Sequence, residues 1–495
     1  MKVFLMFADK DFDVKKPLPA NAHALVQDLE LDTLFKAMAR DDKFLLDVVK
    51  RAVLLNLTDV TSINYRQHVL SDCLERANVV RELYDVAVNA IQGEKQMWGS
   101  IRSPDSILSR SLRLLEEYVG ALNQLRRISA RSGGLFRSEG FTRFFSMITE
   151  EVDDAYLATV QDHLKRLRFE TGVLISAGLG KGLKGSNYVL RKAPEEKHAW
   201  IQRLLGDRGS SYSFEIDDRD EAGATALREL RERGINGVAD AAAQSVDHIL
   251  SFFVALRTEL AFYIGCMNLQ EQLASQSEPV CMPVPLPADT LELNATNLCD
   301  VCLALKMGRK VVSNDLRANG KSLIVITGAN QGGKSTFLRS IGLAQVMTQC
   351  GMFVAAERFR ASICAGVFTH YKREEDATMK SGKFDEELKR MSEIADQIKP
   401  LCILLLNESF SSTNEREGSE IARQVIRALL EANIRVFLVT HMYDLAEWFS
   451  DQKTNNNTLF LRAERQEDGQ RTFKIVEGEP LPTSYGADLY KQVFA

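Results

Sequence analysis

The chain has 495 residues, too many for one hydrophobic core, and this length predicts about two to four domains. Its 45% hydrophobic and 26% charged residues exclude a largely disordered chain. The formal net charge of −5 excludes nucleic-acid binding through overall positive charge, so any such binding must come from a local basic region.

The first residues and the cysteines bear on where the protein works. The apolar run at residues 3–8 is too short for a signal peptide, and we expect a first strand there. No run approaches about 18 apolar residues, so we expect no membrane-spanning segment. Eight scattered cysteines without a disulfide framework favour reduced thiols and a cytoplasmic protein.

Residues 22–151 are predicted to be mostly helical. Apolar residues recur at helical spacing around residues 29–38, 44–57 and 63–91. Only Pro17 and Pro19 precede Pro104, which favours long, uninterrupted helices.

The pattern changes between residues 171 and 216, where three short strands are expected at 173–177, 188–192 and 212–216. Residues 180–185 match G-x-G-x-x-G, but a strand follows where a dinucleotide site needs a helix, so we expect a turn. Residues 164–203 carry nine Lys or Arg against three Glu. Such a basic insertion is a candidate nucleic-acid contact, and a solvated surface of mixed charge explains it equally well.

A long helix is expected after Gly237, with a heptad seam that packs against another helix. The seam residues are Val246, Ile249, Phe253, Leu256, Leu260, Tyr263 and Met267. Four prolines between residues 279 and 287 predict a linker. Beyond them strands and helices alternate, as in an α/β domain built on a sheet.

A nucleotide-binding loop stands in this second half. An apolar strand at residues 323–327 leads into Gly-Ala-Asn-Gln-Gly-Gly-Lys-Ser-Thr and then into a helix predicted at 337–349. This is the P-loop pattern in its required strand–loop–helix context, in which backbone N–H groups surround phosphates. Lys334 should reach the β- and γ-phosphates, and the Ser335 hydroxyl should bind Mg²⁺. The predicted ATP-binding residues are Gly328, Ala329, Asn330, Gln331, Gly332, Gly333, Lys334, Ser335 and Thr336.

Two further apolar strands end in candidate catalytic residues. The strand at 401–406 is apolar on both faces, as a central parallel strand would be, and ends in Asn407 and Glu408. Glu408 is the candidate general base or water-orienting residue. Asn407 is the second candidate Mg²⁺ ligand, with an amide where a carboxylate is usual. The strand at 436–440 ends in His441, a candidate sensor of the γ-phosphate.

With these elements in this order, the chain resembles the MutS family of DNA repair ATPases. The P-loop is similar to the family's G-P-N-x-G-G-K-S-T, and residues 351–357 resemble its G-x-x-V-P-A-E. Residues 312–315 are similar to a V-P-N-D element whose first residues lie by the adenine, which implies a role for Val312. Thr413-Asn414, Glu417-Gly418 and Ser484-Tyr485-Gly486 also match, so the resemblance covers residues 311–489.

The resemblance implies a homodimer in which each signature segment meets the partner's γ-phosphate. That segment is Ser381-Gly382-Lys383-Phe384, and Gly382 stands where the family's serine belongs, so Ser381 is the candidate contact. The family's Asp is replaced by Asn407. Residues 28–31 and 63–67 resemble the start of the family's helical core and lever more weakly. We expect neither an N-terminal mismatch-reading domain nor a C-terminal nuclease domain.

The predicted fold is a multidomain α plus α/β chain. Residues 1–290 would form a helical core and lever domain with a clamp-like insertion at about 165–220, and 291–495 a P-loop ATPase domain. The predicted function is a dimeric, ATP-hydrolysing clamp on duplex or branched DNA in repair or recombination, with ATP and Mg²⁺ bound. The alternative is a nucleotide-gated scaffold with little or no hydrolysis, which Asn407 supports. A transporter-like or SMC-like ATPase is disfavoured because no LSGGQ run is present.

Overall fold

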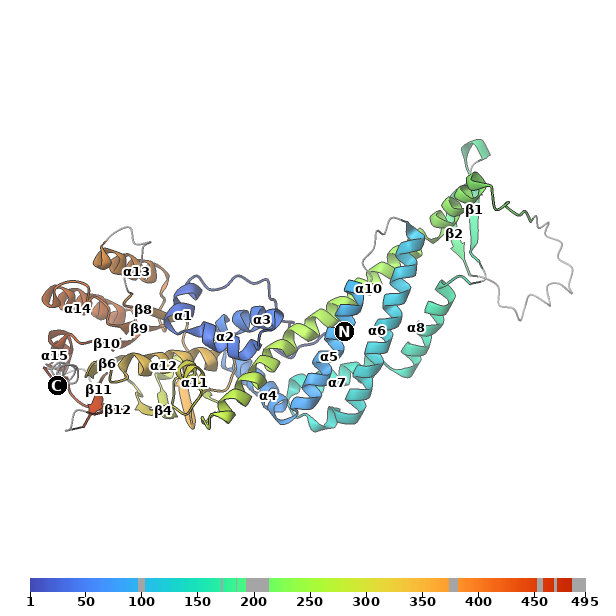
Figure 1. Cartoon of the computed structure of the whole chain (residues 1–495). Helices are drawn as coiled ribbons and strands as arrows, with labels where there is room; N and C mark the ends of the chain where they lie inside the picture. Colours follow the sequence, from blue (N-terminus) through green and yellow to red (C-terminus); the bar gives the residue numbers. More distant parts are fainter. Residues whose placement is uncertain are drawn as a thin grey trace. The chain divides into compact units, whose positions relative to one another are not determined.

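The computed structural model describes residues 1–96, 103–170, 172–183, 185–192, 213–373, 382–451, 457–466 and 470–482 (Figure 1). The chain divides into two compact units. The helical unit comprises Met1–Val3, Arg81–Leu135 and Thr142–Arg257, and the sheet unit comprises Phe4–Val80, Phe136–Phe141 and Thr258–Ala495. The predicted domain boundary at residue 290 does not coincide with the division between these two units, and it stays a prediction.

The helical unit is built from long amphipathic helices and one hairpin. Its elements are α5 (Ala77–Gln96), α6 (Pro104–Ser132), α7 (Glu139–Glu151), α8 (Asp154–Leu167), β1 (Leu174–Leu179), β2 (Gly185–Arg191) and α10 (Glu221–Ser275), of which α5, α7 and α10 belong in part to each unit. Helix α6 begins with Pro104 after a capping box of Ser103 and Ser106, which satisfies its first N–H groups.

The hairpin confirms two of the three strands predicted for the insertion. β1 and β2 pair antiparallel, and residues 181–183 form a 3-10 turn between them. The expected turn between two strands is therefore confirmed for the described residues of the glycine-rich stretch. Residues 213–216 form no strand, and Tyr212 lies outside the described residues. Helix α10 begins at Glu221, well before Gly237, and all seven predicted seam residues are buried.

We expected no segment apolar enough to span a membrane, but helix α10 is long and apolar enough by composition. Its most apolar window of 18 residues has a mean hydropathy of 1.5, which is enough to cross a membrane by length and composition. Within the protein, 67% of that window is buried. Burial against other elements therefore accounts for the apolar residues, as in the core helix of a globular protein.

The sheet unit begins with four short helices, α1 (Ala22–Asp28), α2 (Leu31–Ala39), α3 (Lys43–Leu54) and α4 (Val60–Glu75). The helix expected over residues 63–91 is broken at Arg76, where φ is −121° and ψ is 37°. The strand expected at residues 3–8 is absent. Instead, the N–H groups of Leu5 and Met6 donate to the buried Glu259 carboxylate at 2.6 and 3.0 Å.

Two sheets follow in the same unit. The four-stranded sheet has the order β3 (Val284–Leu286), β7 (Arg358–Ser362), β4 (Leu293–Leu298) and β5 (Asn314–Arg317). The proline cluster is therefore not only a linker, because Pro285 lies in β3. That strand is at the edge of the sheet, where a residue without an N–H is tolerated.

The six-stranded sheet has the order β12 (Arg471–Glu477), β11 (Thr458–Arg465), β6 (Leu323–Gly328), β10 (Arg435–Val439), β9 (Ile403–Asn407) and β8 (Val367–Tyr371). All neighbours pair parallel except β11 and β12. The carboxyl ends of β6, β9 and β10, which carry the predicted site residues, therefore meet at one edge.

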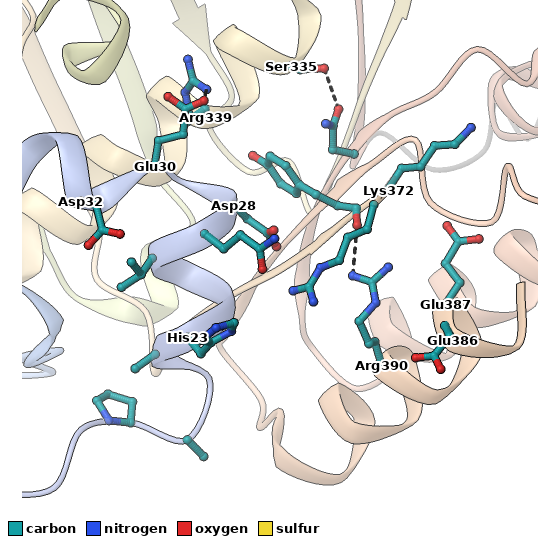
Figure 2. Close-up of a pocket in the computed structure, with 18 of the residues that line it drawn as sticks. His23, Asp28, Glu30, Asp32, Ser335, Arg339, Lys372, Glu386, Glu387 and Arg390 are labelled. Atoms are coloured by element: carbon teal, nitrogen blue, oxygen red, sulfur yellow. Dashed lines mark hydrogen bonds and ion pairs between the residues drawn. The ribbon is translucent and has the colours of Figure 1, made fainter. Parts of the chain in front are cut away.

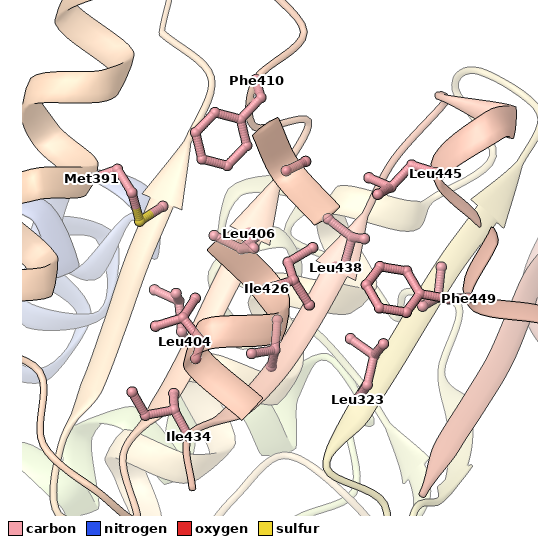
Figure 3. Packing of buried hydrophobic residues seen from close by; sticks show 14 of the residues in the cluster. Leu323, Met391, Leu404, Leu406, Phe410, Ile426, Ile434, Leu438, Leu445 and Phe449 are labelled. Atoms are coloured by element: carbon pink, nitrogen blue, oxygen red, sulfur yellow. The ribbon is translucent and has the colours of Figure 1, made fainter. Parts of the chain in front are cut away.

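Helices cover both faces of this sheet. On one face, α13 (Lys383–Gln397), α14 (Glu415–Glu431) and α15 (Tyr443–Asp451) pack onto alternate strand residues such as Leu404, Leu406 and Leu438 (Figure 3). On the other face, α12 (Lys334–Gln349) packs so closely that a Cβ on Gly342 would lie 2.6 Å from Leu405. The strand and the helix that flank the loop between β6 and α12 are therefore both held in the packed layers.

Candidate functional site

The loop between β6 and α12 depends on glycines at two positions. Gly328 has a φ of 104°, and a Cβ there would lie 2.9 Å from the Ala463 nitrogen of β11. Gly333 has a φ of 90° and precedes the first residue of α12. Because other residues rarely adopt these angles, the glycines allow the loop to turn back over the N-terminus of a 16-residue helix.

Lys334 lies inside the loop. Its ammonium group donates to the carbonyl oxygens of Gly328 and Ala329 at 2.9 and 3.0 Å, and the side chain is buried. Burial lowers the pKa of Lys334, and the negative charge of Glu408 acts in the opposite direction. The ammonium group is thus held inside the loop by the loop's own carbonyl oxygens.

Glu408 and His441 follow neighbouring strands of the sheet. The Glu408 N–H donates to the Val439 oxygen at the end of β10 at 2.9 Å, which ties the end of β9 to its neighbour. Thr440 in turn donates its N–H to Ile326 of β6 at 3.2 Å. His441 follows directly and is exposed. The ends of β9, β10 and β6 are therefore joined by hydrogen bonds beside the loop.

A cavity of about 890 Å³ brings most of the predicted site together. Residues 330–336 of the loop, Val312, Glu408 and His441 all line it. Gly328 instead lines a smaller cavity, of about 560 Å³, and Ala329 is buried. Ser381 lies outside the described residues.

Sequence reasoning missed several residues around this cavity. Phe473 of β12 lines it with a half-exposed ring, and Arg309 and Lys310 add positive charge to its wall. Arg471 also reaches the loop, with its guanidinium 3.4 Å from the Gln331 amide oxygen. No local motif marks Phe473 or Arg471, because they stand about 140 residues after the loop; Arg309 and Lys310 directly precede Val311 and Val312 and could have been included with them.

The two predicted Mg²⁺ ligands contact each other. The Ser335 hydroxyl donates to the Asn407 amide oxygen at 2.9 Å. Both residues line a second, larger cavity of about 1400 Å³ (Figure 2). Ser335 also lines the cavity of about 890 Å³. A hydroxyl and an amide oxygen are ligands that Mg²⁺ accepts, so the pair fits this ion, although it supplies no negative charge.

The loop after β9 is also held by its own side chains. Asn414 caps α14 by accepting the Arg416 N–H at 3.0 Å, and Thr413 donates to Glu417 at 3.2 Å. A Cβ on Gly418 would lie 2.3 Å from the Phe410 oxygen, so this glycine lets the loop approach the start of α14.

Two protein-family models match this chain, and together they cover most of its residues. The model of the MutS2 N-terminal domain matches residues 58–276, and that of MutS domain V matches residues 324–494. DNA mismatch repair protein MutS of Thermotoga maritima is 30% identical over 181 residues, or 36% of this chain and 23% of the relative. MutS protein homolog 4 of Mus musculus is 32% identical over 137 residues, 28% of this chain and 14% of the relative.

Endonuclease MutS2 of Streptococcus equi subsp. equi is 32% identical over 136 residues, 27% of this chain and 18% of the relative. The chain thus aligns with less than a quarter of the length of each of these relatives.

Proposed function

The chain belongs to the MutS family, and from this premise we propose that it is a DNA-binding protein that binds and hydrolyses ATP. One observation carries the proposal: the P-loop, Glu408 and His441 line the same cavity at the carboxyl edge of a parallel sheet. In open α/β sheets, this edge is where ligands bind.

In the proposed reaction, the triphosphate lies on the N-terminus of α12 and Lys334 moves from its two carbonyl partners to the phosphate oxygens. Glu408 accepts a proton from the water that attacks the γ-phosphorus. The bond between that phosphorus and the bridging oxygen breaks, and ADP and phosphate leave. His441 lines the same cavity and orients the γ-phosphate. Val312 and Phe473 form an apolar wall against which the adenine ring packs.

Ser335 and Asn407 would hold the Mg²⁺ ion, which neutralises charge on the phosphates when it is bound. Both oxygens already lie within hydrogen-bond distance of each other. Because neither is charged, we expect the ion to be bound weakly and hydrolysis to be slow.

For DNA, we propose that residues 1–290 act as core and lever, with the basic hairpin region at about 165–220 as a clamp-like contact. Two chains would form a homodimer, with Ser381 of each completing the partner's nucleotide site. Contacts from Lys and Arg to phosphates release counterions, so affinity for DNA should fall steeply with salt. Binding of the purified chain to duplex, mismatched, branched and single-stranded DNA at several salt concentrations tests this. A flat salt dependence, or no binding, contradicts the DNA part.

A second candidate is a nucleotide-gated scaffold that binds ATP without turnover, which Asn407 favours. Single-turnover hydrolysis with Mg²⁺ separates the two. The main proposal expects phosphate release by the unmodified chain and a loss of about a hundredfold or more in Glu408→Gln with ATP still bound. If the unmodified chain releases no phosphate while Asn407→Asp does, the scaffold is the better description.

A further inference from the structure

Glu408 is the first residue of a turn that forms hydrogen bonds to β8 and α13. We propose that His370 and Ser409 are positioning residues for Glu408, and that they link its place in the site to helix α13. The proposal rests on the role of Glu408 in the proposed function.

The turn, residues 408–410, is anchored by hydrogen bonds to two other elements, β8 and α13. The Ser409 hydroxyl lies 2.7 Å from Nδ1 of His370 and 2.7 Å from the His370 carbonyl oxygen at the end of β8. The Phe410 N–H donates to the Glu387 carboxylate of α13 at 2.8 Å. The Phe410 ring also stacks on the His370 ring, with centroids 5.7 Å apart.

His370 is bonded to α13 as well, because its Nε2 lies 3.0 Å from the Glu387 carbonyl oxygen. Since a carbonyl only accepts, Nε2 must carry the proton. Burial lowers the pKa of His370 to about 4, so the ring is neutral near pH 7 and Nδ1 is an acceptor. The single Ser409 hydroxyl hydrogen is therefore shared between Nδ1 and the carbonyl oxygen of His370, and the His370 ring donates to α13.

All four side chains are shielded from water: His370 is 0%, Ser409 and Phe410 1%, and Glu387 2% exposed. Water therefore cannot replace a partner that is lost, and removing one leaves a buried polar group unsatisfied. Loss of one of these partners should therefore loosen the turn more than loss of an exposed hydrogen bond would.

The backbone of the turn needs this support. Glu408 has a φ of 53° and Phe410 a φ of 63°, both in the left-handed region that glycine favours. Such angles persist in other residues only where the surroundings fix them. The direction of the Glu408 side chain follows from its backbone angles, so a loosened turn moves the carboxylate. A displacement of about 1 Å can cost a hundredfold in rate.

The network meets the nucleotide cavity through Glu408, since neither His370, Ser409 nor Glu387 lines it. Its effect should therefore fall on the rate of hydrolysis and not on ATP affinity. A residue that acts through Glu408 also has no effect once Glu408 is inactivated, because coupled residues are not additive.

The test uses the full chain. Ser409→Ala should lower kcat for ATP hydrolysis about tenfold or more, with the ATP dissociation constant changed less than about twofold. In the Glu408→Gln background, Ser409→Ala should lower the residual rate no further. The matched control is Ser362→Ala in β7, a buried serine whose hydroxyl also has two partners, Thr290 at 2.6 Å and the Glu292 N–H at 2.8 Å, and which should leave kcat unchanged.

Thermal unfolding of each variant identifies a failure to fold. If Ser409→Ala does not fold, His370→Gln takes its place, because the amide can still bond the Glu387 carbonyl while the Ser409 partner is lost. An unchanged kcat overturns the inference, and so does an equal loss in the unmodified chain and in the Glu408→Gln background. Failure of both Ser409→Ala and His370→Gln to fold also overturns it. If the unmodified chain binds ATP without hydrolysing it, the hydrolytic part of the proposed function fails and the inference falls with it. Normal hydrolysis that is insensitive to Ser409→Ala overturns the inference alone.

Discussion

The clearest perturbation of the site is Asn407→Asp. The Asn407 side chain is half-buried at the end of β9, and its amide oxygen accepts the Ser335 hydroxyl at 2.9 Å. An aspartate has the same shape and keeps that acceptor, so the exchange adds one negative charge and changes little else. The charge lies where the Mg²⁺ ion of the nucleotide is expected.

The size of the effect follows from Coulomb's law. Two unit charges about 4 Å apart attract by about 1 kcal/mol in bulk water and about 4 kcal/mol at the effective dielectric near a protein surface. For a divalent ion these values double to about 2 and 8 kcal/mol, and desolvation of the carboxylate opposes most of the gain. If about two thirds of the gain is lost, roughly 0.7 to 2.7 kcal/mol remains, which corresponds to about threefold to hundredfold tighter Mg²⁺ binding.

The assay is ATP hydrolysis as a function of Mg²⁺ concentration. Asn407→Asp should lower the half-saturating concentration of Mg²⁺ by that factor. Asn319→Asp is the control for net charge, because Asn319 is exposed in the same unit and its side chain accepts the Leu293 N–H at 3.0 Å, away from the metal ligands. An unchanged or higher half-saturating concentration in Asn407→Asp refutes the assignment of Asn407 as a metal ligand.

Three further predictions concern other parts of the sheet unit. Gly328→Ala should destabilise the protein by about 2 kcal/mol or more in denaturant titrations, because it forces an alanine to a φ of 104° with its Cβ 2.9 Å from the Ala463 nitrogen; equal stability would contradict this. Lys334→Ala should weaken ATP binding about tenfold or more in equilibrium titrations, since charge-assisted hydrogen bonds to phosphate are lost; unchanged affinity would speak against the site. Burial raises the pKa of Glu259 from 4.5 to about 7, so the folded state binds its proton more tightly than the unfolded state. Roughly 3 kcal/mol of stability should therefore be present below pH 4.5 and lost as the pH rises to about 7. Glu259→Gln should remove this dependence, and a wild-type profile in that variant would contradict the pKa.

The parts of the site that sequence could predict are those written in consecutive residues. β6, β9 and β10 are apolar on both faces, and a polar site residue follows the end of each strand within a few residues. Because parallel strands place such ends at one edge, the sequence alone was enough to predict that Lys334, Glu408 and His441 lie together.

The parts that it could not predict depend on partners far along the chain. The N–H groups of residues 5 and 6 pair with a carboxylate more than 250 residues away instead of a neighbouring strand. Pro285 belongs to a strand only because β3 is at an edge. Likewise, His370, Ser409 and Glu387 come from the end of β8, the turn after β9 and α13, and no spacing in the sequence indicates that they meet.

The most direct test of the central claim is the affinity for DNA in three nucleotide states: ATP with Mg²⁺, ADP with Mg²⁺, and no nucleotide. The proposed function predicts that the unmodified chain binds DNA with an affinity that changes between these states. At a nucleotide concentration equal to the dissociation constant of the unmodified chain, Lys334→Ala holds little nucleotide, so its DNA affinity should change much less. DNA affinity that does not respond to nucleotide in the unmodified chain, or that responds equally in Lys334→Ala, would contradict it.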